Sequence, residues 1–302
     1  AEADSLAALR AKVAVLPWME LESSLPDLER RYLGRAVSLD GRALLFDETR
    51  LLRAAAKYGR ALAHIVTMYR TLRAHMGDRP FDFEVSVDET ETPTTVHEHY
   101  FLAAEMRRLG IGWVSLAPRF VGRFEKGVDY LGDLDVLERD LAGHAAVMRT
   151  IGGYKLSLHS GSDKFSVYPL AARHTHGLVH LKTAGTSYLE ALRVWAEVEP
   201  ATFREVLDFA RARYETDRAT YHVSADLHAV PASGTLDDAA LPELLDQFAA
   251  RQVLHVTFGS VLDRYGERLR AVLRAHEDRY HDLLARHFAR HLEPFCTTNQ
   301  GV

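Results

Sequence analysis

Three histidines recur in one short pattern along the second half of the chain. His180 lies in VHLKT, His222 in YHVSA and His255 in LHVTF, and each is followed by an apolar residue and then a polar one. Because side chains alternate along a β-strand, these imidazoles are predicted to share one face of neighbouring strands. Converging imidazoles bind divalent transition metals such as Zn, Mn, Ni or Co. The pattern therefore predicts a metal site.

A lone histidine in a strand is more often a hydrogen-bonded structural residue than a ligand. The repeat favours the metal interpretation, because buried imidazoles must each find partners for two ring nitrogens. Staggered strands would place His222 at a different depth from His180 and His255. His222 and His255 are predicted to bind the metal, and His180 either completes the set or donates a proton.

Carboxylates cluster in VDETETPTT, residues 87–95, after an alternating strand. Barrel enzymes keep catalytic groups at the carboxyl ends of their strands. Glu89 is the first choice for a proton carrier, and Asp88 is either the second proton carrier or a contact of the metal. The alternative is a solvated loop that caps the next helix.

The stretch LHSGSDKFS, residues 158–166, joins a strand to a helix. Its backbone amides and Lys164 suit an anion, such as a sugar carboxylate or a phosphate. His159 and Ser160 at the strand end are therefore predicted to bind substrate. The alternative is an ordinary turn in which Ser162 or Asp163 caps the helix.

Three further side chains are candidates for contact with substrate. Alternation points Lys182 inward, where a lysine needs an anionic partner, so it is predicted to bind a substrate carboxylate or to stabilise an enolate. Arg119, which lies nearer the loop, is a weaker candidate for binding the same substrate anion. Asp226 is predicted to contact substrate, and it could serve as a base beside a metal-bound water in a metallohydrolase.

Six strands that alternate with helices must position these residues. They are predicted at 81–89, 112–120, 154–162, 178–186, 221–227 and 252–260. A polar face shared by consecutive parallel strands favours an α/β fold of the (β/α)8 TIM-barrel type over a doubly wound sheet. Eight strands are needed, so the first two are expected upstream of Ala1 or, less favoured, in KVAVLPW and AVSLDG.

The other elements divide into residues 1–80, a helical and hairpin segment, and residues 81–302, the barrel body with its terminal helix. Asp40-Gly41 predicts a hairpin, and a long helix is expected between Asp47 and Gly77. Thr95 with Glu98 forms a capping box for the helix that follows. A long helix is predicted from 262 to 287. Four histidines of the charged terminal region are expected to be solvated: His276, His281, His287 and His291.

The composition narrows the class of protein. The chain has 302 residues, of which 47% are hydrophobic and 26% charged, with a net charge of −5. The sequence has no dominant Lys/Arg stripe of the kind that would indicate nucleic-acid binding. No apolar run reaches the ~18 residues of a membrane span. The single Cys296 excludes an internal disulfide and is compatible with a reducing compartment. A cytoplasmic protein is expected, and an oligomer is possible.

Three stretches, GGYKLSLHSGSDKFSVYPL, HLKTAGTSYLEALR and YHVSADL, resemble the tagaturonate/fructuronate epimerases of hexuronate catabolism, with relatives discussed as ketose 4-epimerases. The resemblance covers about residues 81–258. It implies a (β/α)8-type barrel, a divalent metal, and inversion of one carbinol of a keto-hexuronate or matching ketose. Family members are longer at the N-terminus. His222 and His255 fall in the motifs expected to hold the metal.

The inverted carbon of such a substrate lies one position beyond the carbon next to the ketone, so its proton is not acidified. Retro-aldol cleavage, rotation of the aldehyde and recondensation would invert it, with a metal, two acid/base groups and a carboxylate anchor. The alternatives are a metal-dependent sugar-acid aldolase or isomerase, a metallohydrolase, and a non-catalytic sugar-acid binding barrel.

Overall fold

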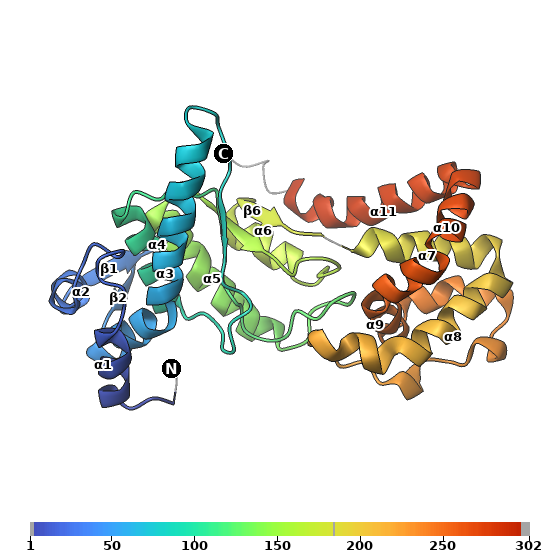
Figure 1. Cartoon of the computed structure of the whole chain (residues 1–302), viewed down its shortest axis with the longest axis horizontal. Helices are drawn as coiled ribbons and strands as arrows, with labels where there is room; N and C mark the ends of the chain where they lie inside the picture. The colour runs from blue at the N-terminus through green and yellow to red at the C-terminus, as the bar shows by residue number, and fades with distance from the viewer. Residues whose placement is uncertain (1–2, 184, 297–302) are drawn as a thin grey trace. The chain divides into compact units, whose positions relative to one another are not determined.

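The computed structural model describes residues 3–183 and 185–296, which divide into two compact units. The first unit contains the residues up to Val121 together with Asp135–Ser157 and Leu178–His180. The second contains Gly122–Leu134, Leu158–Gly177 and the described residues from Leu181 onward. Figure 1 labels the helices and strands of both units.

The elements before residue 182 combine helices with short strands. In chain order they are α1 (Leu6–Ala14), α2 (Leu25–Tyr32), β1 (Ala36–Leu39), β2 (Arg42–Leu45), α3 (Glu48–Met76), β3 (Glu84–Ser86), α4 (Val96–Arg108), β4 (Ser115–Ala117), α5 (Leu134–Ile151), β5 (Lys155–Leu158), α6 (Tyr168–Thr175) and β6 (Val179–Leu181).

The elements after residue 185 are helical. They are α7 (Thr186–Val198), α8 (Pro200–Asp217), the short 3₁₀ helices η1 (Arg218–Thr220), η2 (Leu227–Ala229), η3 (Ser233–Thr235), η4 (Asp238–Ala240) and η5 (Pro242–Asp246), and then α9 (Phe248–Val256), α10 (Phe258–Ala275) and α11 (Glu277–Cys296).

Four of the predicted strands form one sheet in the order β3-β4-β5-β6. β3 and β4 pair in parallel, with Val85 opposite Leu116, and β4 pairs in parallel with β5, with Leu116 opposite Leu156. These three side chains are buried, since each is at most 4% exposed. The sheet confirms an α/β fold with helical connections between parallel strands.

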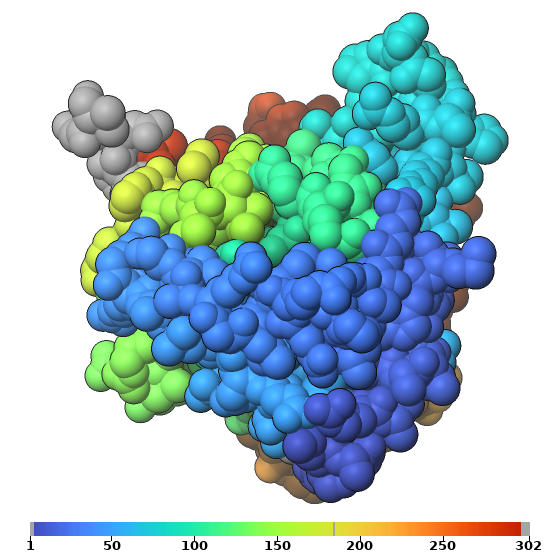
Figure 2. Space-filling model, turned by 90° about the vertical axis from the view of Figure 1, so that its left-hand side faces the viewer, coloured from blue at the N-terminus to red at the C-terminus, as the bar shows by residue number. Residues whose placement is uncertain are grey.

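The N-terminal segment folds as its local signals predict. β1 and β2 form an antiparallel hairpin in which Asp40 and Gly41 both have positive φ. Asp47 accepts a hydrogen bond from the Arg50 N–H at the start of α3, and Gly77 ends the helix with φ 58°. Residues of this segment, in blue, form the middle and much of the lower part of the face that Figure 2 presents.

Two predicted strands are wrong. Residues 252–260 belong to α9 and α10, so His255 lies on a helix. A short, fully buried apolar run suits a helix as well as a strand, and Ala249-Ala250 favours the helix. Residues 221–226 are irregular, although burial alternates as predicted, with Val223 and Ala225 buried and His222 exposed.

A closed barrel is not confirmed, because the described residues form one four-stranded parallel sheet and one two-stranded hairpin. Within those residues, no helix combines the length and the apolar character needed to cross a membrane.

The second unit has a helical core in which α7 packs against α8, α9, α10 and α11 (Figure 1). Trp195 of α7 is fully buried in it, and its indole N–H donates to Glu199 at 3.1 Å. Trp195 thus packs inside the protein, with the acceptor that a buried indole N–H needs.

The expectation for the terminal histidines is wrong in part. The predicted single helix is divided at His276 into α10 and α11. On α11, His287 is 5% and His291 is 1% exposed, whereas His281 lies at the surface. Residues four apart share one helix face, and this face of α11 packs against α6 and α7.

The capping box of α4 gives the first prediction. Thr95 Oγ1 accepts from the Glu98 N–H at 3.2 Å, and Glu98 Oε2 accepts from the Thr95 N–H at 2.8 Å. Thr95→Ala should lower the free energy of unfolding by about 1 kcal/mol in urea titrations. Thr67→Ala, whose hydroxyl donates to Ala63 O within α3, is the control and should be near neutral. Equal losses in both variants would contradict the capping role.

Candidate functional site

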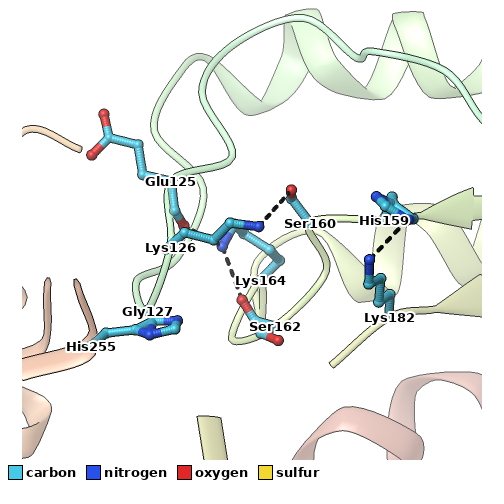
Figure 3. Close-up of a pocket in the computed structure, with 9 residues that line it drawn as sticks. All are labelled: Glu125, Lys126, Gly127, His159, Ser160, Ser162, Lys164, Lys182 and His255. Carbon is cyan, nitrogen blue, oxygen red and sulfur yellow. Dashed lines mark hydrogen bonds between the residues drawn. The ribbon is translucent and has the colours of Figure 1, made fainter. Parts of the chain in front are cut away.

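A small pocket lies within the second unit (Figure 3). It measures about 30 Å³, which is room for roughly one or two water molecules or a group of similar size. Its lining residues come from three loops and one helix: Glu125, Lys126, Gly127, His159, Ser160, Ser162, Lys164, Lys182 and His255. Three ammonium groups around one cavity make it electropositive.

Lys164 is the buried cation of this pocket. It is 1% exposed, and its ammonium donates to the carbonyl oxygens of Glu125, Val128 and Ser162 at 2.9, 2.6 and 2.9 Å. Burial lowers its pKa to about 8, against the opposing effect of Asp163. All three of its donors are engaged, so Lys164 holds two loops together. Its direct contact with substrate stays a prediction.

The other two lysines have weaker attachments. Lys126 donates to Ser160 Oγ at 3.4 Å, and Lys182 donates to His159 Nε2 at 3.0 Å (Figure 3). Lys182 is exposed at the end of β6, where it lines the pocket, and its predicted contact with a substrate anion stays a prediction. An exposed lysine needs no buried counter-ion, and it can turn toward an anion at little cost.

His255 enters the pocket from α9 between two glycines. A Cβ at Gly127 would lie 2.9 Å from His255 Cδ2, and one at Gly185 would lie 2.8 Å from His255 Cε1. The ring is therefore held on both sides by backbone. Among the described residues, neither ring nitrogen has a hydrogen-bond partner. Burial lowers the pKa of His255 to about 4, so the imidazole is neutral near pH 7.

A network around Glu125 positions the segment that carries His222. Glu125 Oε2 accepts from the Ser224 N–H at 2.9 Å and from Gln252 Nε2 at 2.8 Å. Gln252 Oε1 in turn accepts from the Ala225 N–H at 2.8 Å. Side chains thus satisfy the backbone donors that a strand partner would otherwise accept. Asp226 is exposed and accepts from the His228 N–H at 2.9 Å, which caps η2.

In the first unit, His180 meets a carboxylate. Its Nδ1 lies 3.0 Å from Glu84 Oε1 and 3.0 Å from Ser157 Oγ, and the Ser157 hydroxyl donates to Glu84 at 2.8 Å. The three residues come from β6, β3 and β5. A carboxylate at Nδ1 fixes the tautomer with its proton there, which leaves Nε2 as the basic nitrogen. His180 therefore has the arrangement of an acid/base residue or a metal ligand.

The carboxylate loop and Arg119 also lie in the first unit. Ser86 donates to Asp88, as expected for two residues on one side of the strand, and Glu89 is exposed. The Arg119 backbone pairs with Thr94, whose hydroxyl accepts from the Arg119 N–H at 3.0 Å. The predicted roles of these side chains stay predictions.

A second group of ligand-type atoms lies in the second unit. Asp163, His287 and His291 offer one oxygen and two nitrogens within 4.8 Å of one another, and all three residues are buried. Burial lowers the pKa of His287 to about 4, and it raises the pKa of the neighbouring Glu190. The alternative prediction for Asp163, a helix cap, is wrong, because α6 begins at Tyr168 without a side-chain cap.

Several site residues were missed from the sequence. Glu125 and Lys126 lie in an irregular loop without a motif, so no periodicity marks them. Glu84 lies in the predicted strand 81–89, and alternation alone gives it no role. The pair His287 and His291 had a usable signal, since two histidines four residues apart share a helix face.

The glycine slot around His255 gives the second prediction. Gly127→Ala would add both a left-handed alanine, at φ +74°, and a methyl 2.9 Å from the His255 ring. Gly34→Ala is the control, because Gly34 has φ +70° with nothing within 4 Å of an added Cβ. Gly34→Ala should cost about 1–2 kcal/mol of unfolding free energy, and Gly127→Ala about 1–3 kcal/mol more. Equal costs in urea titrations would mean that His255 adapts freely.

Comparisons with known proteins identify the family. A family model described as tagaturonate epimerase matches residues 7–295. The tagaturonate/fructuronate epimerase of Thermotoga maritima is 48% identical over 268 residues, which cover 88% of this chain and 55% of that protein. The native crystal structure of fructuronate-tagaturonate epimerase UxaE from Cohnella laeviribosi matches with a TM-score of 0.91 and 34% identity, over 97% of this chain and 60% of that one.

A glycerol complex of the Cohnella enzyme gives a TM-score of 0.90 at 35% identity. This chain thus spans 55–60% of the length of these relatives. The match over residues 7–295 and the identity to the Thermotoga protein show that the chain belongs to the tagaturonate epimerase family.

Proposed function

We propose that this chain contributes to a metal-dependent epimerase that interconverts tagaturonate and fructuronate. The observation that carries the proposal is the lysine-lined pocket with a buried imidazole at its side that has no hydrogen-bond partner among the described residues. A keto-hexuronate combines a carboxylate with hydroxyl and keto oxygens. The pocket offers cations for the first group and an uncharged nitrogen ligand beside them.

The pocket suits a carboxylate better than a whole sugar, because its volume is about 30 Å³. Lys182 is the principal anchor in this proposal. Its ammonium is exposed and donates to His159 Nε2 at 3.0 Å, so a substrate carboxylate in that place would gain a charge-assisted hydrogen bond. Lys126 and Ser160 lie beside it on the cavity wall. The buried charge of Lys164 adds to the positive potential.

The residues of the second unit fit a metal ligand at His255. Within the described part of the chain neither nitrogen of this buried ring has a hydrogen-bond partner, which suits a metal ligand, and the lowered pKa keeps the imidazole in its metal-binding form. His255, together with His222, would hold a divalent ion of the Zn, Mn, Ni or Co class. Such an ion would supply Lewis-acid stabilisation of negative charge on the keto and hydroxyl oxygens.

The proposed reaction is retro-aldol cleavage followed by aldol addition. A base removes the proton of the carbinol hydroxyl, the adjacent carbon–carbon bond breaks, and its electron pair passes to the fragment that carries the ketone. The aldehyde turns, the bond re-forms on its other face, and the new alkoxide takes a proton. Glu89 and Asp88 are the proposed proton carriers, and His180, oriented by Glu84, is a third.

The barrel also belongs to the proposal. The order β3-β4-β5-β6 follows the chain without reversal, as in a (β/α)8 barrel and unlike a doubly wound sheet.

The direct test is turnover by the isolated chain. Incubation of either uronate with Mn²⁺ or Zn²⁺ should yield the other, observed by NMR, and chelation should stop the reaction. Glu89→Gln should lower the rate by roughly 10²-fold or more, because the amide cannot carry a proton. If Asp88→Asn has that effect instead, the roles are exchanged. Cleavage products without epimer would indicate an aldolase, and binding without conversion a sugar-acid binding protein.

The anchor is tested by substrate choice. Lys182→Met should raise the KM for a uronate by roughly 10- to 100-fold, the worth of one hydrogen bond to a charged group, and change neutral ketoses little. Lys155→Met replaces another exposed lysine, on β5 and outside the pocket lining, and should leave both substrates unaffected. An equal rise in KM for uronate and ketose would show that Lys182 does not bind the substrate carboxylate.

A further inference from the structure

The strongest feature that the proposed function does not use is the cluster of Asp163, His287 and His291. Asp163 lies in the turn before α6, two residues beyond Gly161, and the histidines lie one turn apart on α11. Asp163 Oδ1 is 3.6 Å from His287 Nε2 and 3.8 Å from His291 Nε2. Their side chains are at most 4% exposed.

The Nε2 nitrogen of each histidine faces the Asp163 carboxylate. His291 Nδ1 lies 2.8 Å from His287 O, and a carbonyl can only accept, so this nitrogen carries the proton. His287 Nδ1 lies 3.6 Å from Glu190 Oε1, the acceptor on its side of the ring. Both Nε2 atoms face Asp163, and His291 Nε2 accepts from the Asp163 N–H, so it carries no proton.

This arrangement leaves one carboxylate oxygen of Asp163 without a hydrogen-bond donor among the described residues. Among the described residues, Asp163 Oδ1 has no hydrogen-bond partner, although it is buried. The Asp163 N–H donates to His291 Nε2 at 3.2 Å, and the Thr186 hydroxyl lies 2.9 Å from His287 Nε2. Neither contact satisfies Oδ1. Oδ1 lies 3.6 and 3.8 Å from the two Nε2 atoms without a hydrogen bond to either, a juxtaposition that a cation among the three atoms would stabilise.

The surroundings match those of protein metal ligands. Metal-bound histidines usually donate their other N–H to a carboxylate or a backbone carbonyl, and ligating carboxylates are themselves hydrogen-bonded. Glu190 and the His287 carbonyl are the oxygens beside the other ring nitrogens of the two histidines. Arg251 is the partner of the carboxylate, since its guanidinium donates to Asp163 Oδ2 at 2.9 Å and leaves Oδ1 available. Tetrahedral ligands about 2.0 Å from zinc lie ~3.3 Å apart, close to the observed 3.6 and 3.8 Å.

We propose that Asp163, His287 and His291 form a structural site for zinc or a similar first-row divalent ion, separate from the ligand proposed at His255. Two imidazole nitrogens and one carboxylate oxygen are ligands that zinc prefers. The ion would fasten α11 to the turn at residues 161–164. That turn also carries Ser162 and Lys164, so the ion would hold one wall of the lysine-lined pocket in place. The proposal does not depend on the epimerase function.

Metal content separates this site from the one at His255. Chain stripped with a chelator and dialysed against limiting Zn²⁺ is assayed by elemental analysis. His287→Gln and His291→Gln should each lose one equivalent of zinc relative to the unsubstituted chain. His281→Gln removes an exposed histidine of the same helix and should lose none. His255→Gln should retain the equivalent that belongs to Asp163, His287 and His291, whether or not the chain is an active epimerase.

Glu190→Gln is a gentler variant, because it touches no ligand atom. It should weaken zinc binding by roughly 10- to 100-fold, whereas Glu197→Gln, on the exposed part of α7, should not. Zinc should also raise the unfolding temperature of the unsubstituted chain, and a crystal grown with zinc should show an anomalous peak about 2.0–2.2 Å from all three ligand atoms. Unchanged zinc content in both ligand variants, or no peak at this position, would overturn the proposal.

Discussion

Each N–H donor of a buried ammonium group needs an acceptor, and Lys164 meets this constraint with three backbone carbonyls. Two of those carbonyls belong to the 125–128 loop and one to its own turn, so the charge cannot be satisfied unless both loops are in place. The same loop supplies Glu125, which orders the segment around Ser224, and Gly127, which flanks His255. Most of the pocket thus depends on the burial of one lysine.

The sequence predicts those elements whose signals are local. Asp40-Gly41 specifies its hairpin because both residues tolerate positive φ, and Thr95 with Glu98 specifies a helix start because each satisfies the other's backbone donor. The strands at 221–227 and 252–260 could not be decided in this way. For the first, Glu125 and Gln252 accept the backbone donors from far along the chain. For the second, full burial removes the periodicity that separates strands from helices.

The candidate site follows the same division. His255 lines the pocket from a helix, between two glycines, and not from the predicted strand, and its metal-binding role stays a prediction. Lys182 and His159 meet because β5 and β6 are neighbouring strands, and the alternation of strands and helices along the sequence predicts that order. Glu125 and Lys126 belong to a loop whose conformation is determined by Lys164 and Arg251, so no neighbouring residue reveals it. Family membership, in turn, rests on the match over residues 7–295 and not on any single pocket residue.

The contact between Asp163 and His291 joins residues 128 positions apart. During synthesis the turn leaves the ribosome long before α11 exists, and at about 5–20 residues per second the delay is roughly 6–26 s. Throughout that interval the turn has Lys164 and its carbonyls but neither histidine. The wall of the pocket is consequently among the last parts of the second unit to mature, and a nascent chain that stalls before α11 presents an incomplete site to chaperones and proteases.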